Sequence, residues 1–214
     1  MNAAIETIDL KKLHKHLFTA PTGEFVMAEV PELRFLMVDG AGDPNSSAEY
    51  ARALGWLYPV AYGIKFAAKS EGRTFVVPPL EGLWHADDPS SFVERRKSEW
   101  RWTMMIMMPD FVTPEQFDAA VAKTRKKLGD PPPSLRLESF REGPSLQALH
   151  IGPYDAEGPL LAKLHDEIMP ERGLTFAGHH HEIYLGDPRK SAPEKLRTIL
   201  RQPVRSRSSA PATA

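Results

Sequence analysis

Apolar residues form runs and alternating patterns that predict two strand-rich halves, each with a long helix. Residues 33–39 are nearly all apolar, which is typical of a buried strand. A helix is predicted over 47–70, with a kink or break near Pro59, because proline lacks the backbone N–H that a helix interior needs. Three more strands are predicted in this half, at 75–77, 80–86 and 99–108.

The second half opens with a helix start signal. Thr113 is a good N-cap, Pro114 suits the first helical position, and Gln116 follows the cap by three residues. This helix should end near Leu128, before Gly129. The later predicted elements are strands at 135–140 and 145–150 joined by a turn at 141–144, a helix at 157–169, a strand at 178–185, and a final helix from Ser191 to about Gln202.

The two halves share an order of elements. LRFLMVDGAGDP and LQALHIGPYDAEGP each precede a helix, and EWRWTMMIM and HHEIYLGD supply the later strands. This predicts an α+β fold: duplicated strand–helix–strand–strand units form a pseudo-symmetric curved antiparallel sheet, with helices on one face and a ligand cleft on the other. We expect a lead-in at 1–24, one domain at 25–204 (units about 30–108 and 113–204), and a disordered tail at 205–214.

Composition excludes several classes of function. The 214 residues carry 27 basic and 28 acidic side chains, so no basic field favours direct binding of nucleic acid. The chain has no cysteine, which excludes disulfides, thiolate nucleophiles and thiolate metal sites. No apolar run approaches the roughly 18 residues of a membrane span, and the N-terminus lacks the apolar core of a signal peptide. We expect a cytoplasmic protein with no cofactor, no membrane partner and no direct nucleic-acid partner.

The predicted strand at 178–185 carries the candidate functional side chains. Alternation places His180, Glu182 and Tyr184 on one face, and Ile183 and Leu185 on the other. Ile183 and Leu185 suit a helix-packed face, which would direct Glu182 and Tyr184 into the cleft. A poorly solvated Glu182 could pair with a cation or act as a general base on water. Tyr184 offers a hydrogen-bond donor and an aromatic wall.

Aromatic and methionine side chains could complete a ligand pocket around this pair. The candidates are Trp56, Tyr58, Tyr62, Trp84, Trp102, Met104 and Tyr154. For each of them a place in the hydrophobic core is the alternative, and Glu182 could instead be a strand carboxylate paired with a nearby His or Lys.

The run His179–His181 suggests a metal site at first sight. Consecutive strand residues point to opposite faces, so only His179 and His181 could share one ion. No further ligand has a fixed spacing from them. We therefore expect an exposed surface run and no metal.

Three segments resemble the GyrI-like small-molecule-binding proteins, in particular their stand-alone subgroup. HEIYLGDPRKSAPEKLRTILRQPV, at 181–204, resembles the C-terminal signature of this family. PPLEGLWH, at 78–85, resembles the E-G-L-W segment of the subgroup, with His85 where a second Trp is common. LHIGPYDAEGPLLAKL, at 149–164, is similar to the strand, G-P-Y turn and helix of the family.

The resemblance implies a fold of two strand–helix–strand–strand units and a binding function. The family is similar to effector-binding domains of multidrug-responsive transcription activators, in which an acidic residue in an aromatic cleft binds lipophilic cations. Glu182 matches the acidic residue of the E-x-Y pattern, and Tyr184 matches its aromatic neighbour. The implied partner is therefore a lipophilic, planar or cationic small molecule.

Two alternatives remain open. The stand-alone subgroup includes hydrolases of cyclopropanoid electrophiles, the DNA-alkylating natural products, which implies a detoxifying reaction with Glu182 as general base and Tyr184 stabilising developing charge. The other alternative is a protein-interaction module that uses the sheet or the basic tail.

Overall fold

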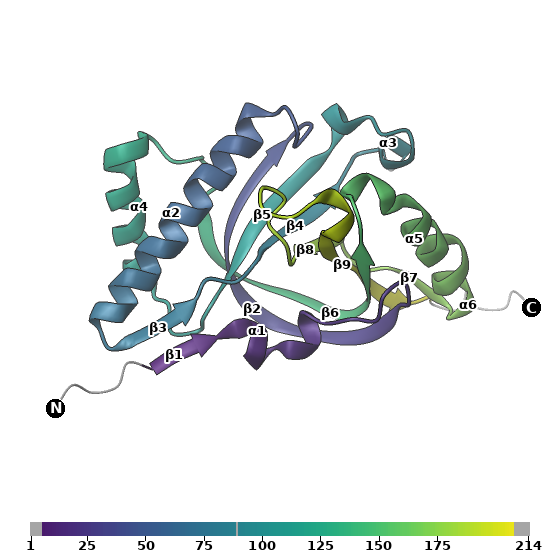
Figure 1. The fold of residues 1–214 in the computed structure, drawn as a ribbon, viewed down its shortest axis with the longest axis horizontal. Coiled ribbons are helices and arrows are strands. Elements are labelled where there is room, and N and C mark those ends of the chain that lie inside the picture. Colours follow the sequence, from purple (N-terminus) through teal and green to yellow (C-terminus); the bar gives the residue numbers. More distant parts are fainter. Residues whose placement is uncertain (1–5, 89, 208–214) are drawn as a thin grey trace, which may run out of the picture.

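The computed structural model describes residues 6–88 and 90–207, and its architecture is α+β (Figure 1). The strands of the main sheet are β2 (Val26–Ala41), β4 (Leu80–His85), β5 (Arg101–Met108), β6 (Arg136–Ile151), β7 (Leu174–Phe176), β8 (His180–Tyr184) and β9 (Arg197–Ser206). They lie in the order β6-β2-β5-β4-β8-β9-β7, and every neighbouring pair is antiparallel. β6 also pairs with β9, so the curved sheet closes into a barrel-like ring.

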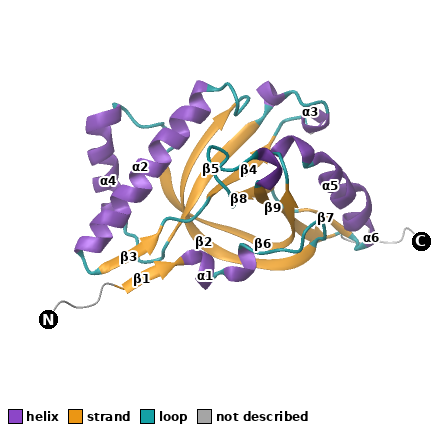
Figure 2. Ribbon diagram, in the orientation of Figure 1, coloured by secondary structure: helices purple, strands orange, loops and turns teal. Residues whose placement is uncertain are grey.

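The longer helices cover the outer face of this ring (Figure 2). α2 (Ala48–Ser70) packs against α4 (Pro114–Leu128) on one side. On the other side, α5 (Gly158–Lys163), a π-helical turn (Leu164–Ile168) and α6 (Met169–Glu171) form one continuous helical stretch. The short α3 (Ser90–Val93) precedes β5.

The N-terminal segment closes the inner side of the ring. It consists of β1 (Glu6–Asp9), α1 (Leu10–Leu13) and a 3-10 turn (Lys15–Leu17), and β1 pairs in parallel with β3 (Arg73–Val76). Leu10 and Leu17 pack there against inward-facing strand residues such as Phe35, Met107 and Ile183. Alternate residues of the same strands face outward and pack against α2, so β5 is buried on both faces.

The predicted α+β class, the curved antiparallel sheet and the longer helices on one face are confirmed. The position predicted for Glu182 and Tyr184 relative to the helices was wrong. Ile183 lies inside the ring, whereas Tyr184 packs on the outer face, in the cluster formed with α2. The candidate site thus shares the helix-covered face, because β8 passes between the strands under α2 and those under α5.

Three local predictions were wrong. The final helix is only a 3-10 turn (Pro193–Lys195), after which the chain continues as β9, paired with both β6 and β8. The turn expected at 141–144 is absent, because β6 runs on through Gly143 and Pro144, opposite Val30 and Glu29 of β2. Residues 205 and 206, assigned to the tail, pair with β7, and 208–214 lie outside the described residues.

Helix α2 continues through Pro59 without the break that was one of the two expected outcomes. The predicted cap of α4 is confirmed: the Thr113 hydroxyl accepts a hydrogen bond from the Gln116 N–H at 3.3 Å, and the Gln116 side chain accepts one from the Thr113 N–H at 3.2 Å.

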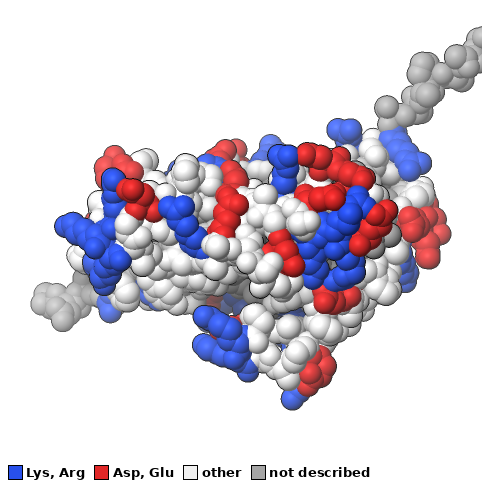
Figure 3. Space-filling view, turned by 90° about the horizontal axis from the view of Figure 1, so that it is seen from above, with Lys and Arg blue, Asp and Glu red and all other residues white. Residues whose placement is uncertain are grey.

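Charges of both signs are interspersed over the face seen from above in Figure 3. In the part of the chain that the structure describes, no helix combines the length and apolar character that crossing a membrane requires.

Candidate functional site

Glu182 occupies the centre of the candidate site, on the outward face of β8. It lies opposite Gly82 of β4 and Leu200 of β9, and its side chain is 14% exposed. Gly82 provides necessary space, since a Cβ there would stand 3.0 Å from Trp84 Nε1 and 3.1 Å from Tyr184 Oη. The acid is therefore set into a closely packed wall of strand residues.

Five aromatic residues, which we call the aromatic cluster, surround this position: Tyr50, Trp84, Trp100, Tyr154 and Tyr184. Trp84 Nε1 donates a hydrogen bond to Tyr184 Oη at 2.9 Å. Tyr154 meets Tyr184 edge-on with ring centroids 5.5 Å apart, and Tyr50 of α2 stacks on Trp84 at 6.5 Å. Trp100 meets the other side of Trp84 edge-on at 5.9 Å. The cluster thus joins α2, β4, β8 and the two segments that contribute Trp100 and Tyr154.

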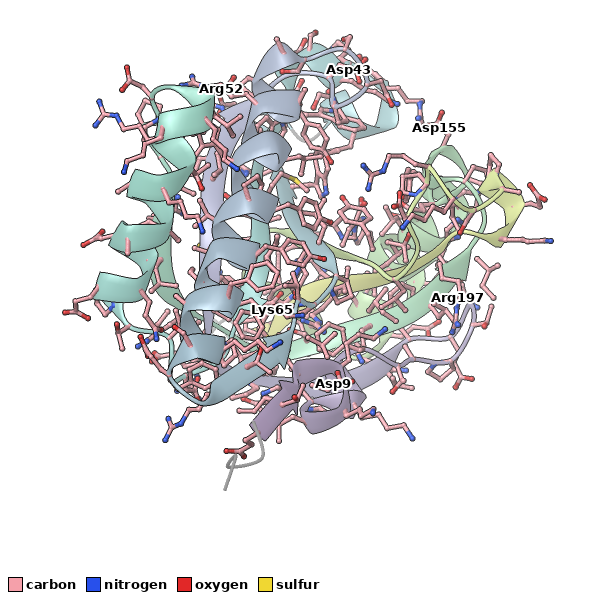
Figure 4. All side chains as sticks on the ribbon, turned by 60° about the vertical axis from the view of Figure 1, so that its left-hand side comes forward. Asp9, Asp43, Arg52, Lys65, Asp155 and Arg197 are labelled. Atoms are coloured by element: carbon pink, nitrogen blue, oxygen red, sulfur yellow. The ribbon has the colours of Figure 1, made fainter. Side chains whose placement is uncertain are left out.

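Figure 4 shows side chains between α2 and the turn that carries Asp155. Asp155, next to Tyr154, accepts a hydrogen bond from Lys97 Nζ at 3.2 Å, and this ammonium lies 5.7 Å from the centre of the Trp100 ring. Asp187, in the loop after β8, pairs with Arg189 at 2.9 Å. The exposed charges at the rim are therefore paired with one another. Among the described residues, His180 is the one basic side chain within 4.0 Å of Glu182, with Nε2 at 3.5 Å from Oε1.

Glu157 is a second carboxyl group at the site, which sequence reasoning missed. It lies directly before α5 and is 4% exposed. Burial raises its pKa to about 10, the negative charge of Glu182 adds to this rise, and the Thr198 hydroxyl opposes it. Glu157 therefore stays protonated at neutral pH beside the Glu182 carboxylate. Its position at the start of a predicted helix was visible in the sequence, but the crossing of that helix over β8 was not.

The charge of Glu182 also affects the pKa values of three tyrosines. Burial raises the pKa of Tyr50, of Tyr184 and of Tyr154, the last to about 12, and the charge of Glu182 is the next cause in each case. All three hydroxyls therefore remain protonated, which suits them to donate hydrogen bonds to an oxygen that gains negative charge.

The remaining predicted pocket residues are divided between core and surface. Trp56, Trp102 and Met104 are at most 2% exposed and belong to the core beneath the aromatic cluster, so their prediction as ligand contacts needs correction. Tyr62 is 45% exposed and stacks on Phe66. Abundant aromatic residues could not distinguish core from pocket in the sequence.

Tyr58 and Tyr50 lie on one row of α2, eight residues apart. Tyr58 is half-buried and close enough to raise the pKa of Tyr154 slightly by its charge. The spacing Tyr50–Leu54–Tyr58, which repeats every four residues, was the signal that could have identified Tyr50.

The histidine run is not an exposed surface run, contrary to expectation. His179 is exposed and stacks on His85 at 4.1 Å, and His180 faces Glu182. His181 is fully buried inside the ring, where Nδ1 lies 2.9 Å from Glu142 and Nε2 lies 3.1 Å from Glu81. Within residues 6–88 and 90–207, no group of three or more His, Asp or Glu side chains could hold a metal ion.

A cavity of about 330 Å³ lies elsewhere, between the N-terminal segment and the end of β5. Its lining includes apolar residues such as Ile8, Leu33 and Phe111 and none of the residues that surround Glu182. We therefore place the candidate site at Glu182, where Glu157, whose pKa is raised, and aromatic side chains converge.

The fold and the site define a small-molecule-binding domain. The family described as "GyrI-like small molecule binding domain" matches residues 24–205, and the chain belongs to this GyrI-like family. A search of curated proteins gives no match.

Solved structures of similar proteins have the same fold. An uncharacterized conserved protein from Listeria innocua is 41% identical, with 92% of this chain and 100% of that chain covered and a TM-score of 0.84. A hydrolase from Listeria innocua is 42% identical, with the same coverage and a TM-score of 0.79. The EcmrR C-terminal domain is 13% identical, with 86% of this chain and 98% of that chain covered and a TM-score of 0.57, and it shares the fold.

Proposed function

We propose that this protein hydrolyses a planar hydrophobic electrophile, with Glu182 as general base and Glu157 as general acid. One observation carries the proposal: two neighbouring carboxyl groups lie among aromatic side chains, and burial together with the Glu182 charge raises the pKa of one of them, Glu157, to about 10. Environments that separate two acids in this way assign one the role of base and the other the role of acid.

The substrate class that fits is a strained cyclopropane conjugated to a carbonyl group, as the family resemblance implies. A water oxygen bonds to the cyclopropane CH₂ carbon while a ring C–C bond breaks, and Glu182 takes a proton from that water. The bonding electrons move through the conjugated system to the carbonyl oxygen, which receives the Glu157 proton and becomes a hydroxyl. The product gains one water, and transfer of the proton from Glu182 back to Glu157 restores the starting state.

The aromatic cluster supplies the remaining requirements of this reaction. Tyr50, which is half-buried and stacks on the buried Trp84, offers flat surface to a polycyclic body. The tyrosine hydroxyls can donate hydrogen bonds to the oxygen that gains charge. The 42% identical Listeria innocua protein described as a hydrolase supports turnover over binding alone.

Incubation with a cyclopropane-containing alkylating agent, followed by liquid chromatography and mass spectrometry, tests the proposal. Wild-type protein should add one water catalytically, and Glu182→Gln and Glu157→Gln should each slow hydration by roughly 10²-fold or more. Glu171→Gln, an exposed glutamate on α6, is the matched control and should retain the wild-type rate. A wild-type rate equal to the protein-free rate would reject the hydrolase proposal.

The second candidate function is the binding of planar lipophilic cations without turnover, as a sensor or sink. The observation that favours it is the Glu182 carboxylate itself, which has His180 as its one basic neighbour within 4.0 Å among the described residues. Calorimetry with a planar monocation should then show binding that Glu182→Gln weakens by about tenfold or more, since a charged hydrogen bond contributes about 1.5–3 kcal/mol. Equal affinity in wild type and variant would exclude Glu182 as the cation anchor.

A further inference from the structure

A row of polar side chains continues from Glu182 under α5, beyond the aromatic cluster. Glu157, Leu161 and His165 follow one another every four residues and so share one side of this helical stretch. Glu157 interacts by charge with Glu182, and His165 with His180. The helical row and the β8 row therefore lie side by side and run in opposite directions.

Several buried polar atoms of these rows have no hydrogen bond within the described residues. They are Glu157 Oε1, Thr198 Oγ1, His165 Nε2 and His180 Nδ1. His180 Nε2 lies 3.5 Å from Glu182 Oε1, and the Thr198 hydroxyl lies near the Glu157 carboxyl, but neither contact has the geometry of a hydrogen bond. Thr198 is fully buried and Glu157 is 4% exposed, so bulk water does not satisfy them. Folded proteins pair nearly all buried polar groups, and a concentration of unpaired ones beside a candidate site needs an explanation.

The helix above this row is irregular at the same place. Leu164–Ile168, which includes His165, forms a π-helical turn between two α-helical segments. Such turns insert an extra residue at a cost in helix stability and occur frequently at functional sites. The irregular turn and the unpaired atoms are independent observations, and both point to a function for the same stretch.

We propose that Glu157, His165, His180 and Thr198 form a polar subsite for a neutral hydrogen-bonding head group of the ligand, such as an amide or a conjugated carbonyl, while the aromatic cluster holds its planar body. This inference rests on the proposed function for the location of the ligand. It adds the residues that bind the neutral polar head of a planar ligand.

The chemistry of the row favours this head group over others. The protonated Glu157, the Thr198 hydroxyl and the two imidazoles can donate or accept hydrogen bonds, which matches an amide or carbonyl. An anionic head would be repelled by the Glu182 carboxylate. A hydrocarbon would leave every polar atom of the row unpaired, which lowers affinity.

The test compares two probes that share a planar body, 2-naphthamide and 2-methylnaphthalene. Their dissociation constants are measured by the shifts of backbone amide signals in NMR titrations of the full chain. Wild-type protein should bind the amide about tenfold tighter or more than the hydrocarbon. Thr198→Val keeps the shape but removes the hydroxyl, and should reduce this preference between about two- and tenfold, the range for one hydrogen bond. Thr74→Val, the same change at another buried hydroxyl without a partner, lies in β3 and should leave the preference unchanged.

Failure of the subsite and failure of the hydrolase proposal give different results. Equal affinities for the two probes, no saturable binding of the amide, or an unchanged preference in Thr198→Val would each overturn the subsite, whether or not the protein hydrates a cyclopropane. Glu157→Gln keeps hydrogen bonding but removes the acid, so it should retain the preference for the amide while hydration falls. Loss of the preference in both Glu157→Gln and Thr74→Val would show a general loss of structure and would also refute the assignment.

Discussion

Replacement of Arg201 by methionine should destabilise the protein strongly, because Arg201 supports a buried ion network inside the ring. Its side chain is 2% exposed and donates to Glu142 at 3.0 Å, to Gln147 at 3.1 Å and to the Leu17 carbonyl at 2.7 Å. Removing one partner of a buried pair costs about 3–5 kcal/mol, and here it would leave the Glu142 carboxylate with His181 as its remaining charged partner among the described residues. That is a large part of the roughly 5–15 kcal/mol by which a domain is stable.

The pKa of Glu142 reflects the contribution of the whole network, His181 and Arg201 together. Burial opposes its ionised form, but the charges of and hydrogen bonds with His181 and Arg201 lower the pKa from 4.5 to about 2. A shift of this size corresponds to roughly 3 kcal/mol of stability, present above pH 4.5 and lost as the pH falls towards 2. The network raises the pKa of His181 above 6.5, so its contribution is complete below pH 6.5 and is lost as the pH rises through the raised value. The ion network should therefore stabilise the fold most between pH 4.5 and 6.5.

Urea unfolding of wild type, Arg201→Met, Glu142→Leu and the double variant measures these effects. With a denaturant slope of about 2 kcal/mol/M, Arg201→Met should lower the midpoint by about 2 M. The double variant should lose less stability than the sum of the two single losses, because neither charge is then left alone. A loss under about 1 kcal/mol in Arg201→Met, or additive losses in the double variant, would refute the reasoning.

Three further predictions concern the site and one helix cap. Gly82→Ala should lower the stability by about 1–3 kcal/mol in thermal unfolding, because its Cβ would stand 3.0 Å from Trp84 Nε1; an unchanged melting temperature would contradict the crowding. Tyr184→Phe loses the 2.9 Å hydrogen bond from Trp84 and a hydrogen-bond donor at the site. Steady-state hydration should therefore slow by about tenfold or more, while urea unfolding should show a stability change of about 1 kcal/mol. A wild-type rate would exclude Tyr184 as a donor to the substrate oxygen. Thr113→Ala removes the N-cap of α4 that pairs with Gln116. It should lower the free energy of unfolding in urea by about 1 kcal/mol and leave the hydration rate unchanged. A slower hydration rate would argue against a purely local role of this cap.

Local signals in the sequence predicted the elements that depend on local chemistry. The cap of α4 depends on Thr113 and Gln116 alone, and both hydrogen bonds are present. The alternation around Glu182 correctly placed His180 and Tyr184 on its face of β8, because strand periodicity does not depend on neighbours.

Features that depend on tertiary pairing could not be predicted in the same way. Ser191, Pro193 and Glu194 resemble a helix start, but β6 and β8 both pair with the following residues, and this pairing stabilises a strand. Glu157 required knowledge of which helix lies over β8, and Trp102 required knowledge that α2 covers it. Sequence reasoning therefore proposed Glu182, as the candidate site does, but named neither Glu157 nor the full aromatic cluster.

Closure of the ring by β6 and β9 separates the residues that carry the fold from those that can vary with the ligand. Glu182, Tyr184 and Trp84 belong to ring strands whose ladders are paired on both sides. Tyr50 and Tyr154, in contrast, come from a helix and a turn outside the ring. A change of ligand preference can then arise by substitution in these outer segments without a new strand register. This architecture would allow the aromatic residues of the outer segments to change while the acidic residue on the ring strand stays in place.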